Sequence, residues 1–384
     1  MNKFPTRCVH AGTIRDDEKK GINSPIYTST SYEFIDQQDT IYPRYLNTPN
    51  EKAVAEKIAS LEDTESALVF SSGMAAISTV LFTFLGQGDH AVFQKGLYGG
   101  TSHFLDREFD RFGIKYSVAA SQSVLDIESC IQENTRLVYI ETPSNPLLSI
   151  TDIEAVAKMA AKKGLMAAKK GLITMIDNTF ASPVNQQPAL AGIDIVVHSA
   201  TKYMGGHSDI LAGAVAGKKE LIDKVYETGL NFGGSLNAMT LYLLERSLKT
   251  MHIRVDRMND NAMELAHFLE THPNIIQVNY PGLPGHPGHE IATRQMTGFG
   301  GMLSFEVNGQ DGIVFQKRLK LIKPSMSLGG LETICCSPAH TSHRHLGPDG
   351  RKSEGIAEEL IRLSVGIEDV EDLKADLDQA LTTG

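Results

Sequence analysis

The chain has 384 residues, of which 41% are hydrophobic and 21% are charged, so it is long enough to fold as two globular parts around a large core. Its formal net charge of -10 argues against a nucleic-acid partner, because proteins that bind nucleic acids usually carry a basic face. No apolar run is long enough to span a membrane, and the four cysteines have neither disulfide nor zinc-site spacing, so we expect a cytoplasmic protein without membrane contact.

The first 47 residues contain several prolines and no strong helical periodicity. We therefore expect this arm to have no core of its own and to lie on another surface, either of its own subunit or of a partner. Tyr42 and Arg44 in this arm are two residues apart, which places both side chains on one side of an extended chain. Together they could grip a phosphate, although an exposed loop is the simpler interpretation of these residues alone.

Helical and strand patterns alternate from residue 51 onward, which predicts an α/β fold with a mostly parallel sheet. Turn-forming and small polar residues separate the segments. The expected helices are 51–61, 75–85 and one from residue 152, and the expected strands are 67–70, 90–94, 137–141, 172–176 and 193–197.

Small polar or ionisable residues follow the carboxyl ends of five of these strands. Ligands of parallel α/β sheets bind at this edge. Any one such residue is commonly a cap or turn residue, but five at one sheet edge predict a ligand site. A lysine there becomes a nucleophile toward carbonyl groups when its pKa is depressed. The five residues are Ser72, Tyr98, Asn145, Asp177 and Lys202.

A seven-residue segment occurs twice in tandem, as residues 159–165 and again as residues 166–172. Seven residues are nearly two helical turns, so the second copy can extend a helix or loop out at Gly164. We expect the strand that carries Asp177 to keep its register in either case.

The pattern changes near residue 251, and a smaller α/β domain is expected from strands at 301–307 and 360–365. The expected division is an arm at 1–47, a large domain at 48–250 and a C-terminal domain at 251–384. The histidines of this region lack metal-site spacing, so no metal is expected. A lone Arg362 among apolar residues needs an anion, either a structural carboxylate or a ligand.

These motifs together resemble the pyridoxal-phosphate enzymes of Cys/Met (trans-sulfuration) metabolism. The resemblance covers nearly the whole chain and implies the aspartate aminotransferase-like fold type I, with a mostly parallel central sheet and a smaller C-terminal α/β domain. It is carried by Pro25-Ile26-Tyr27, Glu141-Thr142-Pro143-Ser144-Asn145-Pro146, Ser199-Ala200-Thr201-Lys202-Tyr203 and Arg362-Leu363-Ser364-Val365-Gly366.

The resemblance also implies roles for individual residues. Lys202 would hold pyridoxal 5′-phosphate covalently and move protons, Asp177 would keep the pyridine nitrogen protonated, and Tyr98 would stack on the ring and act as an acid. Asn145 would contact the ring's phenolic oxygen. The phosphate would be held by Ser72, Gly73, Met74, Ser199 and Thr201, and by Tyr42 and Arg44 of a neighbouring subunit. The substrate would be held by Arg362, Ser327, Asn145 and Tyr98.

A site shared between subunits implies a homo-oligomer, expected as a tetramer built from two dimers. The implied reaction on a small amino-acid substrate is γ-elimination or γ-replacement, as in cystathionine γ-lyases and γ-synthases. The alternatives within the family are methionine γ-lyase, which releases methanethiol, 2-oxobutyrate and ammonia, and O-acylhomoserine sulfhydrylase. Further alternatives are an aminotransferase of similar fold and an inactive binding protein.

Two positions depart from the patterns of these subfamilies. Gly100 stands where methionine γ-lyases typically carry cysteine, which weakens that assignment. Met326 stands where enzymes that handle cystathionine at Cγ typically carry glutamate. Because a methionine side chain cannot pair with the distal ammonium group of cystathionine, Met326 puts cystathionine in doubt as the preferred substrate.

Overall fold

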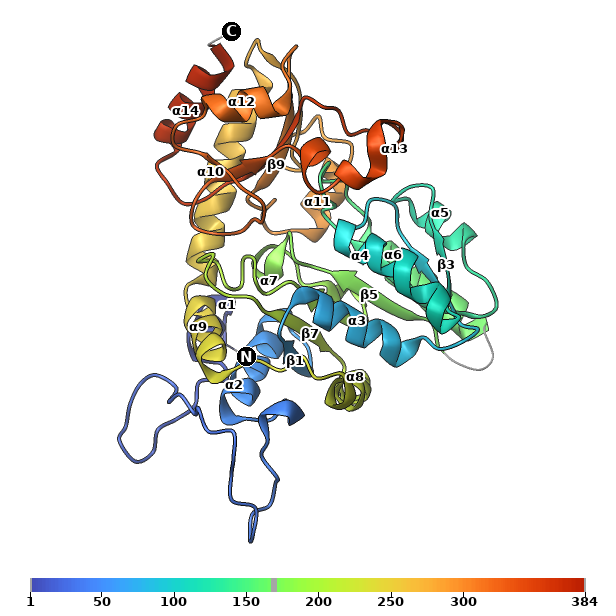
Figure 1. The fold of residues 1–384 in the computed structure, drawn as a ribbon, viewed down its shortest axis with the longest axis vertical. Coiled ribbons are helices and arrows are strands. Elements are labelled where there is room, and N and C mark those ends of the chain that lie inside the picture. The colour runs from blue at the N-terminus through green and yellow to red at the C-terminus, as the bar shows by residue number, and fades with distance from the viewer. Residues whose placement is uncertain (1, 167–170, 383–384) are drawn as a thin grey trace.

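The computed structural model describes residues 2–166 and 171–382, which form two β-sheets connected by helices (Figure 1). The larger, seven-stranded sheet has the order β1-β7-β6-β5-β4-β2-β3. The smaller, five-stranded sheet has the order β10-β11-β12-β9-β8. No described helix is both long enough and apolar enough to cross a membrane.

Helices and strands alternate along the part of the chain that builds the larger sheet, as expected. The strands are β1 (Ser66–Phe70), β2 (His90–Phe93), β3 (Lys115–Val118), β4 (Thr135–Glu141), β5 (Ile173–Asp177), β6 (Ile195–His198), β7 (Gly213–Gly217), β8 (Ile275–Asn279), β9 (Met302–Val307), β10 (Lys323–Pro324), β11 (Ile334–Cys336) and β12 (Leu360–Ser364). The helices are α1 (Phe4–His10), α2 (Pro49–Glu62), α3 (Gly73–Phe84), α4 (Gly99–Phe104), α5 (Val124–Ser129), α6 (Ile153–Met166), α7 (Ser182–Asn185), α8 (Lys219–Phe232), α9 (Ala238–Leu248), α10 (Met251–Glu270), α11 (His289–Gln295), α12 (Gly312–Arg318), α13 (Gly347–Ser353) and α14 (Val370–Thr382).

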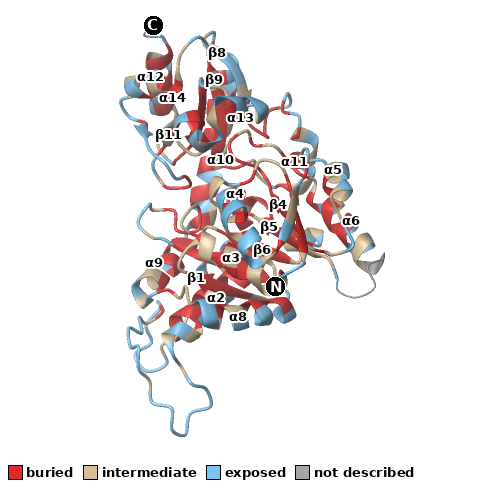
Figure 2. Cartoon of the chain, turned by 45° about the vertical axis from the view of Figure 1, so that its right-hand side comes forward, coloured by how far each residue is buried: buried red, intermediate tan, exposed pale blue. Residues whose placement is uncertain are grey.

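Helices cover both faces of the larger sheet because successive strand residues point to opposite sides. Leu68 and Phe70 of β1 pack in one core cluster with α3 and α8, whereas Ala67 and Val69 pack in another with α2. Helices α5 and α6 cover the same face as α2, over the other strands. Buried residues therefore lie along the strands and the facing sides of the helices (Figure 2).

The strands of the larger sheet are mostly parallel, which confirms the prediction. Strand β7 is the exception, because it runs antiparallel to both β1 and β6. It was not predicted, since its sequence Gly-Ala-Val-Ala-Gly has few of the large residues that mark a strand. Its small residues allow close approach of the next layer: a Cβ on Gly213 would lie 2.0 Å from the Ser72 carbonyl oxygen. The first residue of β7 thus lies directly against the residue that precedes α3.

The N-terminal arm contains one helix that the sequence did not reveal. Helix α1 begins with a proline at its first turn and buries only Cys8, so its amphipathic signal is weak. Lys57 of α2 donates a hydrogen bond to the Cys8 carbonyl over 3.1 Å, which fixes α1 on the larger sheet's helices. The rest of the arm extends away from the sheets (Figure 1) and exposes Ile22 and Ile35.

Helix α10 connects the two sheets. It contacts α7 and α9 near the larger sheet, and β8, β9 and α14 in the smaller one. Its apolar face, which includes Met258 and Leu265, is completely buried. The expected boundaries at residues 47 and 250 stay predictions, although the two sheets draw their strands from residues 66–217 and 275–364.

The tandem repeat lies on α6 and in the chain that follows it. Helix α6 contains the whole first copy, and residues 167–170 of the second copy lie outside the described part of the chain. A Cβ on Gly164 would lie 3.2 Å from the Leu172 nitrogen, so the two ends of segment 165–171 are neighbours. Strand β5 pairs in continuous register with β4, which places Asp177 opposite Glu141.

Deleting residues 165–171 is therefore expected to leave the fold and the turnover close to those of the full chain, because Gly164 and Leu172 can be joined with little movement. Thermal unfolding followed by circular dichroism and a turnover assay would measure this. Deletion of residues 153–159, which removes as many residues but includes the buried Val156, should unfold the protein. A single-copy chain with very different turnover would contradict the expectation.

Candidate active site

The five residues predicted at the strand ends lie around one cavity of about 250 Å³ at the carboxyl edge of the larger sheet. Residues from the smaller sheet and its connections close the cavity from the other side. The structure thus brings together residues from distant parts of the chain. The predicted site residues that line the cavity are Ser72, Gly73, Met74, Tyr98, Asn145, Asp177, Ser199, Thr201, Lys202, Ser327 and Arg362.

Lys202 lies in a tight turn after β6, and its Nζ donates a hydrogen bond to Ser327 Oγ over 2.8 Å. Burial, together with the nearby positive charge of Arg362, lowers the pKa of Lys202 to about 8, against the opposing effect of Asp177. A substantial fraction of the amine is therefore neutral near pH 8. This is the state that attacks a carbonyl group.

Asp177 ends strand β5 and points into the cavity. Its Oδ1 accepts a hydrogen bond from the Thr179 backbone nitrogen over 2.9 Å. Burial raises its pKa, while the hydrogen bonds from Thr179 and the nearby His198 act in the opposite direction. Since burial has the larger effect and the pKa is raised, a positively charged group bound in the cavity would stabilise the ionised carboxylate.

The start of α3 forms a cradle suited to a phosphate. Ser72 caps the helix by accepting a hydrogen bond from the Ala75 nitrogen over 3.1 Å, so the helix begins at the cavity wall. A Cβ on Gly73 would lie 2.9 Å from the Ser199 Cβ, so only glycine allows this approach. Free amide groups at a helix start, with the hydroxyls of Ser199 and Thr201 nearby, match the needs of a phosphate dianion.

Arg362 reaches the cavity from β12 and is only 7% exposed. Its Nη1 donates to Asn145 Oδ1 over 2.9 Å and its Nη2 donates to the Ser327 carbonyl over 3.0 Å. Its buried Nε has no partner, and Arg362 forms no ion pair with any residue that the structure describes. The sequence left two partners open for Arg362, a structural carboxylate or an anionic ligand. The geometry favours the anionic ligand.

Tyr98 stands at the mouth of the cavity with 47% of its surface exposed. Its ring lies over Gly100, where a Cβ would come within 2.4 Å of the ring. Its backbone nitrogen donates to Glu141 Oε2 over 2.8 Å. The ring is thus held beside the cavity and can reach a bound ligand.

Tyr42 and Arg44 do not line this cavity. The Arg44 guanidinium donates to the Leu230 carbonyl oxygen and lies 5.1 Å from the centre of the Tyr45 ring. The backbone after Tyr42 forms a short 3-10 turn rather than an extended strand. Their predicted role at a neighbouring subunit's phosphate stays a prediction.

Several residues of the cavity, including Glu141, Thr179 and Cys336, were not predicted from the sequence. Glu141 was identified only as the last residue of its strand and the first of a family motif, with no role of its own. Its position directly before the loop that carries Asn145 was the available signal. Cys336 lies opposite Arg362 in the pairing of β11 with β12, a partnership that only the fold reveals.

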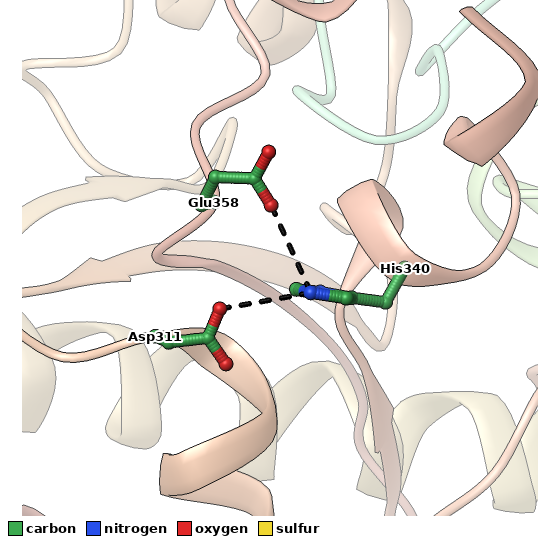
Figure 3. A group of neighbouring side chains, drawn as sticks. All are labelled: Asp311, His340 and Glu358. Atoms are coloured by element: carbon green, nitrogen blue, oxygen red, sulfur yellow. Dashed lines mark ion pairs between the residues drawn. The ribbon is translucent and has the colours of Figure 1, made fainter. Parts of the chain in front are cut away.

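One histidine of the C-terminal region meets two carboxylates outside the cavity (Figure 3). His340 Nε2 lies 3.6 Å from Asp311 Oδ2 and 3.8 Å from Glu358 Oε2. These groups could hold a metal ion, but each also has a structural partner. Asp311 caps α12 through the Ile313 nitrogen, and Glu358 pairs with Arg351. The prediction that the protein uses no metal stays a prediction.

Comparison with known proteins agrees with the family resemblance seen in the sequence motifs. The chain matches the family described as Cys/Met metabolism PLP-dependent enzyme over residues 5–382. It is 40% identical to the L-methionine gamma-lyase of Fusobacterium nucleatum, over 98% of this chain and 97% of that protein. It is 39% identical to the cystathionine gamma-lyase of Bacillus subtilis, over 99% of both proteins.

A solved structure extends this similarity to the fold. The crystal structure of cystathionine gamma-lyase from Lactobacillus plantarum, complexed with L-serine, has a TM-score of 0.94 and 37% identity over 100% of this chain and 99% of that chain. The expected aspartate aminotransferase-like fold type I is therefore confirmed.

The lowered pKa of Lys202 predicts how its reactivity depends on pH. In the cofactor-free protein, labelling of Lys202 by an amine-reactive reagent should rise with pH and reach half its maximum at about pH 8, because the neutral amine reacts. Peptide mass spectrometry would measure labelling, with the exposed Lys224 of α8 as an internal control. A midpoint near the ordinary lysine value of 10.5 would contradict this account of the site.

Proposed function

Because the chain belongs to the family of Cys/Met metabolism PLP-dependent enzymes, we propose that it catalyses elimination or replacement at Cγ of a sulfur or homoserine-derived amino acid. Cystathionine γ-lyases and γ-synthases carry out reactions of this type. One observation supports the proposal above others: the buried, unpaired Arg362 faces the same cavity as Lys202. The carboxylate of an amino-acid substrate fits the guanidinium of Arg362, and the amino group of the same substrate would then lie near Lys202.

The residues around the cavity fit pyridoxal 5′-phosphate, the cofactor of this family. Lys202 would hold it, Asp177 would pair with its ring nitrogen, and Asn145 would contact its phenolic oxygen. Tyr98 would lie on its ring. The phosphate would be held at the start of α3 by Ser72, Gly73 and Met74, and by Ser199 and Thr201. When bound, the cofactor supplies the electron sink that stabilises negative charge at the substrate Cα.

The chain's own residues then supply binding and proton transfer. Arg362 and Ser327 would hold the substrate carboxylate, which fixes Cα near Lys202 Nζ, only 2.8 Å from Ser327 Oγ. The neutral amine of Lys202 would take a proton from Cα and, once it has released that proton, would take a second one from Cβ. Tyr98 would donate a proton to the leaving group on Cγ.

Methionine γ-lyase activity is the second candidate, because the outer part of the cavity is apolar. Met326, Leu211 and Leu328 line it. The acidic residues among the described lining residues are Glu141 and Asp177, which lie at the strand ends. A thioether with an apolar substituent therefore fits this part of the cavity better than the distal ammonium group of cystathionine.

We also propose that the active enzyme is a homo-oligomer with sites shared between subunits, as a tetramer of two dimers. The exposed apolar residues of the arm, such as Ile22 and Ile35, support a covered position against another chain. Tyr42 and Arg44 would then reach a neighbouring cavity rather than their own.

The experiment that tests the function is an assay of 2-oxobutyrate release by the purified, cofactor-loaded protein. The substrates are L-methionine, cystathionine, homocysteine and an O-acylhomoserine, the last with and without added cysteine. Rapid release from the sulfur amino acids indicates a γ-lyase. If added cysteine suppresses 2-oxobutyrate release from the O-acylhomoserine and a new thioether product forms, the protein is a γ-synthase. Amino transfer to a keto acid without 2-oxobutyrate release would contradict the proposal.

Met326 offers a test of substrate preference. The substitution Met326→Glu should raise kcat/KM for cystathionine relative to methionine by up to about fivefold, because position 326 is 62% exposed and an exposed ion pair contributes little more. Met326→Gln is the control, since it has the same shape without the charge. An equal rise in both variants would show that charge is not the cause.

A further inference from the structure

A cysteine in the wall of the cavity has no role in the chemistry above. Cys336 is the last residue of β11 and lines the same cavity as Lys202 and Arg362. The pairing of β11 with β12 places Cys336 directly opposite Arg362. Directly opposed residues of an antiparallel pair lie on one face of the sheet, with Cβ atoms about 4.5–5.5 Å apart. The thiol of Cys336 and the side chain of Arg362 are therefore neighbours in the cavity wall.

The cysteine that precedes Cys336 faces the other way. Because successive residues of a strand point to opposite faces, Cys335 lies on the far side of β11 from the cavity. There, Gln316 Nε2 donates a hydrogen bond to Cys335 Sγ over 3.5 Å. Burial raises the pKa of the Cys335 thiol to about 12. Of these two adjacent thiols, Cys336 is the one that a ligand in the cavity can reach.

Arg362 independently shows that this part of the cavity accepts an anion. It is 7% exposed, and its buried Nε has no hydrogen-bond partner in the part of the chain that the structure describes. Its two terminal nitrogens donate to neutral oxygens of Asn145 and Ser327. Nε is the guanidinium nitrogen nearest the strand backbone, so an anion bound there lies close to the neighbouring strand. A small molecule held by its carboxylate is thus brought to the Cys336 thiol.

We propose that Cys336 is a modification site for small disulfides that carry a carboxylate group, such as those that thiol-containing amino acids form on oxidation. Arg362 holds the carboxylate, and the Cys336 thiolate attacks the nearer sulfur of the disulfide. A new S–S bond forms to Cys336, the S–S bond of the small disulfide breaks, and its other half leaves as a thiolate. The leaving thiolate takes up a proton equivalent to the one that Cys336 lost, so no further oxidant or reductant is needed.

The modification blocks the cavity. The half of the disulfide that stays on Cys336 keeps its carboxylate on Arg362, where the substrate carboxylate is held in the proposed function. The loss of turnover rests on that proposed function, whereas the exchange itself depends on Cys336 and Arg362. An excess of a free thiol reverses the exchange and releases the cavity. The cavity wall thus contains a reversible block that responds to oxidised thiols.

Two matched reagents test the proposal on the cofactor-loaded protein. Dithiodipropionate is a disulfide with carboxylates and no amino group, and hydroxyethyl disulfide is a neutral counterpart. Peptide mass spectrometry with fragmentation follows the mixed disulfide at each cysteine. At Cys336 the carboxylate reagent should react about tenfold faster than the neutral one, because it binds the guanidinium. At the partly exposed Cys130, outside the cavity, it should react no faster, because the net charge of -10 repels it.

Removal of the positive charge tests the role of the arginine. In Arg362→Met, shown to be folded by thermal unfolding, the preference for dithiodipropionate at Cys336 should fall to that at Cys130. Sodium acetate makes the same test without a substitution: it should slow the reaction of dithiodipropionate at Cys336 more than sodium chloride of equal ionic strength does. Equal preferences at Cys336 and Cys130 in the wild type, or no adduct at Cys336 with either reagent, would overturn the proposal.

Measuring the adduct and the turnover separately distinguishes two kinds of failure. A carboxylate-dependent adduct at Cys336 in a protein that turns over no tested sulfur substrate would support the modification site and refute the proposed function. Normal γ-elimination in a protein that forms no adduct at Cys336 would do the reverse.

Discussion

A guanidinium buried without a carboxylate is the feature on which the rest of the site depends. Arg362 is held by neutral oxygens of Asn145 and Ser327, so its charge is oriented but not compensated by any residue that the structure describes. An unpaired buried ion costs several kcal/mol, which an anionic ligand can recover on binding. The same charge helps to lower the pKa of Lys202. One arginine thus prepares the cavity for a carboxylate and makes the neighbouring amine reactive.

The two sheets fix this arrangement from opposite sides. Arg362 is placed by the pairing of β12 with β9 and β11, while Asp177 is placed by the pairing of β5 with β4 and β6. The small residues of β7 and Gly73 let the start of α3 reach the same edge. The chemistry therefore depends on strand register, because a slip of one residue would turn a side chain to the other face.

Much of this could be predicted from the sequence, because strand ends and tight turns leave local signals. The turn around Lys202 and the strand before Asp177 are of this kind. Strand β7 was missed because its small residues carry no strand signal, and Glu141 was missed because its importance lies in a contact with Tyr98 across the sheet. The partner of Arg362 could not be decided from sequence, since it depends on which carboxylates the fold brings near. The roles of Tyr42 and Arg44 involve a second chain and stay predictions.

The central claim is that Lys202 is the residue that holds the cofactor. Reduction of the pyridoxal-phosphate-loaded protein with borohydride, followed by digestion and peptide mass spectrometry, identifies the lysine to which the cofactor is fixed. We expect a pyridoxyl group on the peptide that contains Lys202 and on no other lysine. Labelling of a different lysine, or a loaded protein with no labelled peptide, would contradict it.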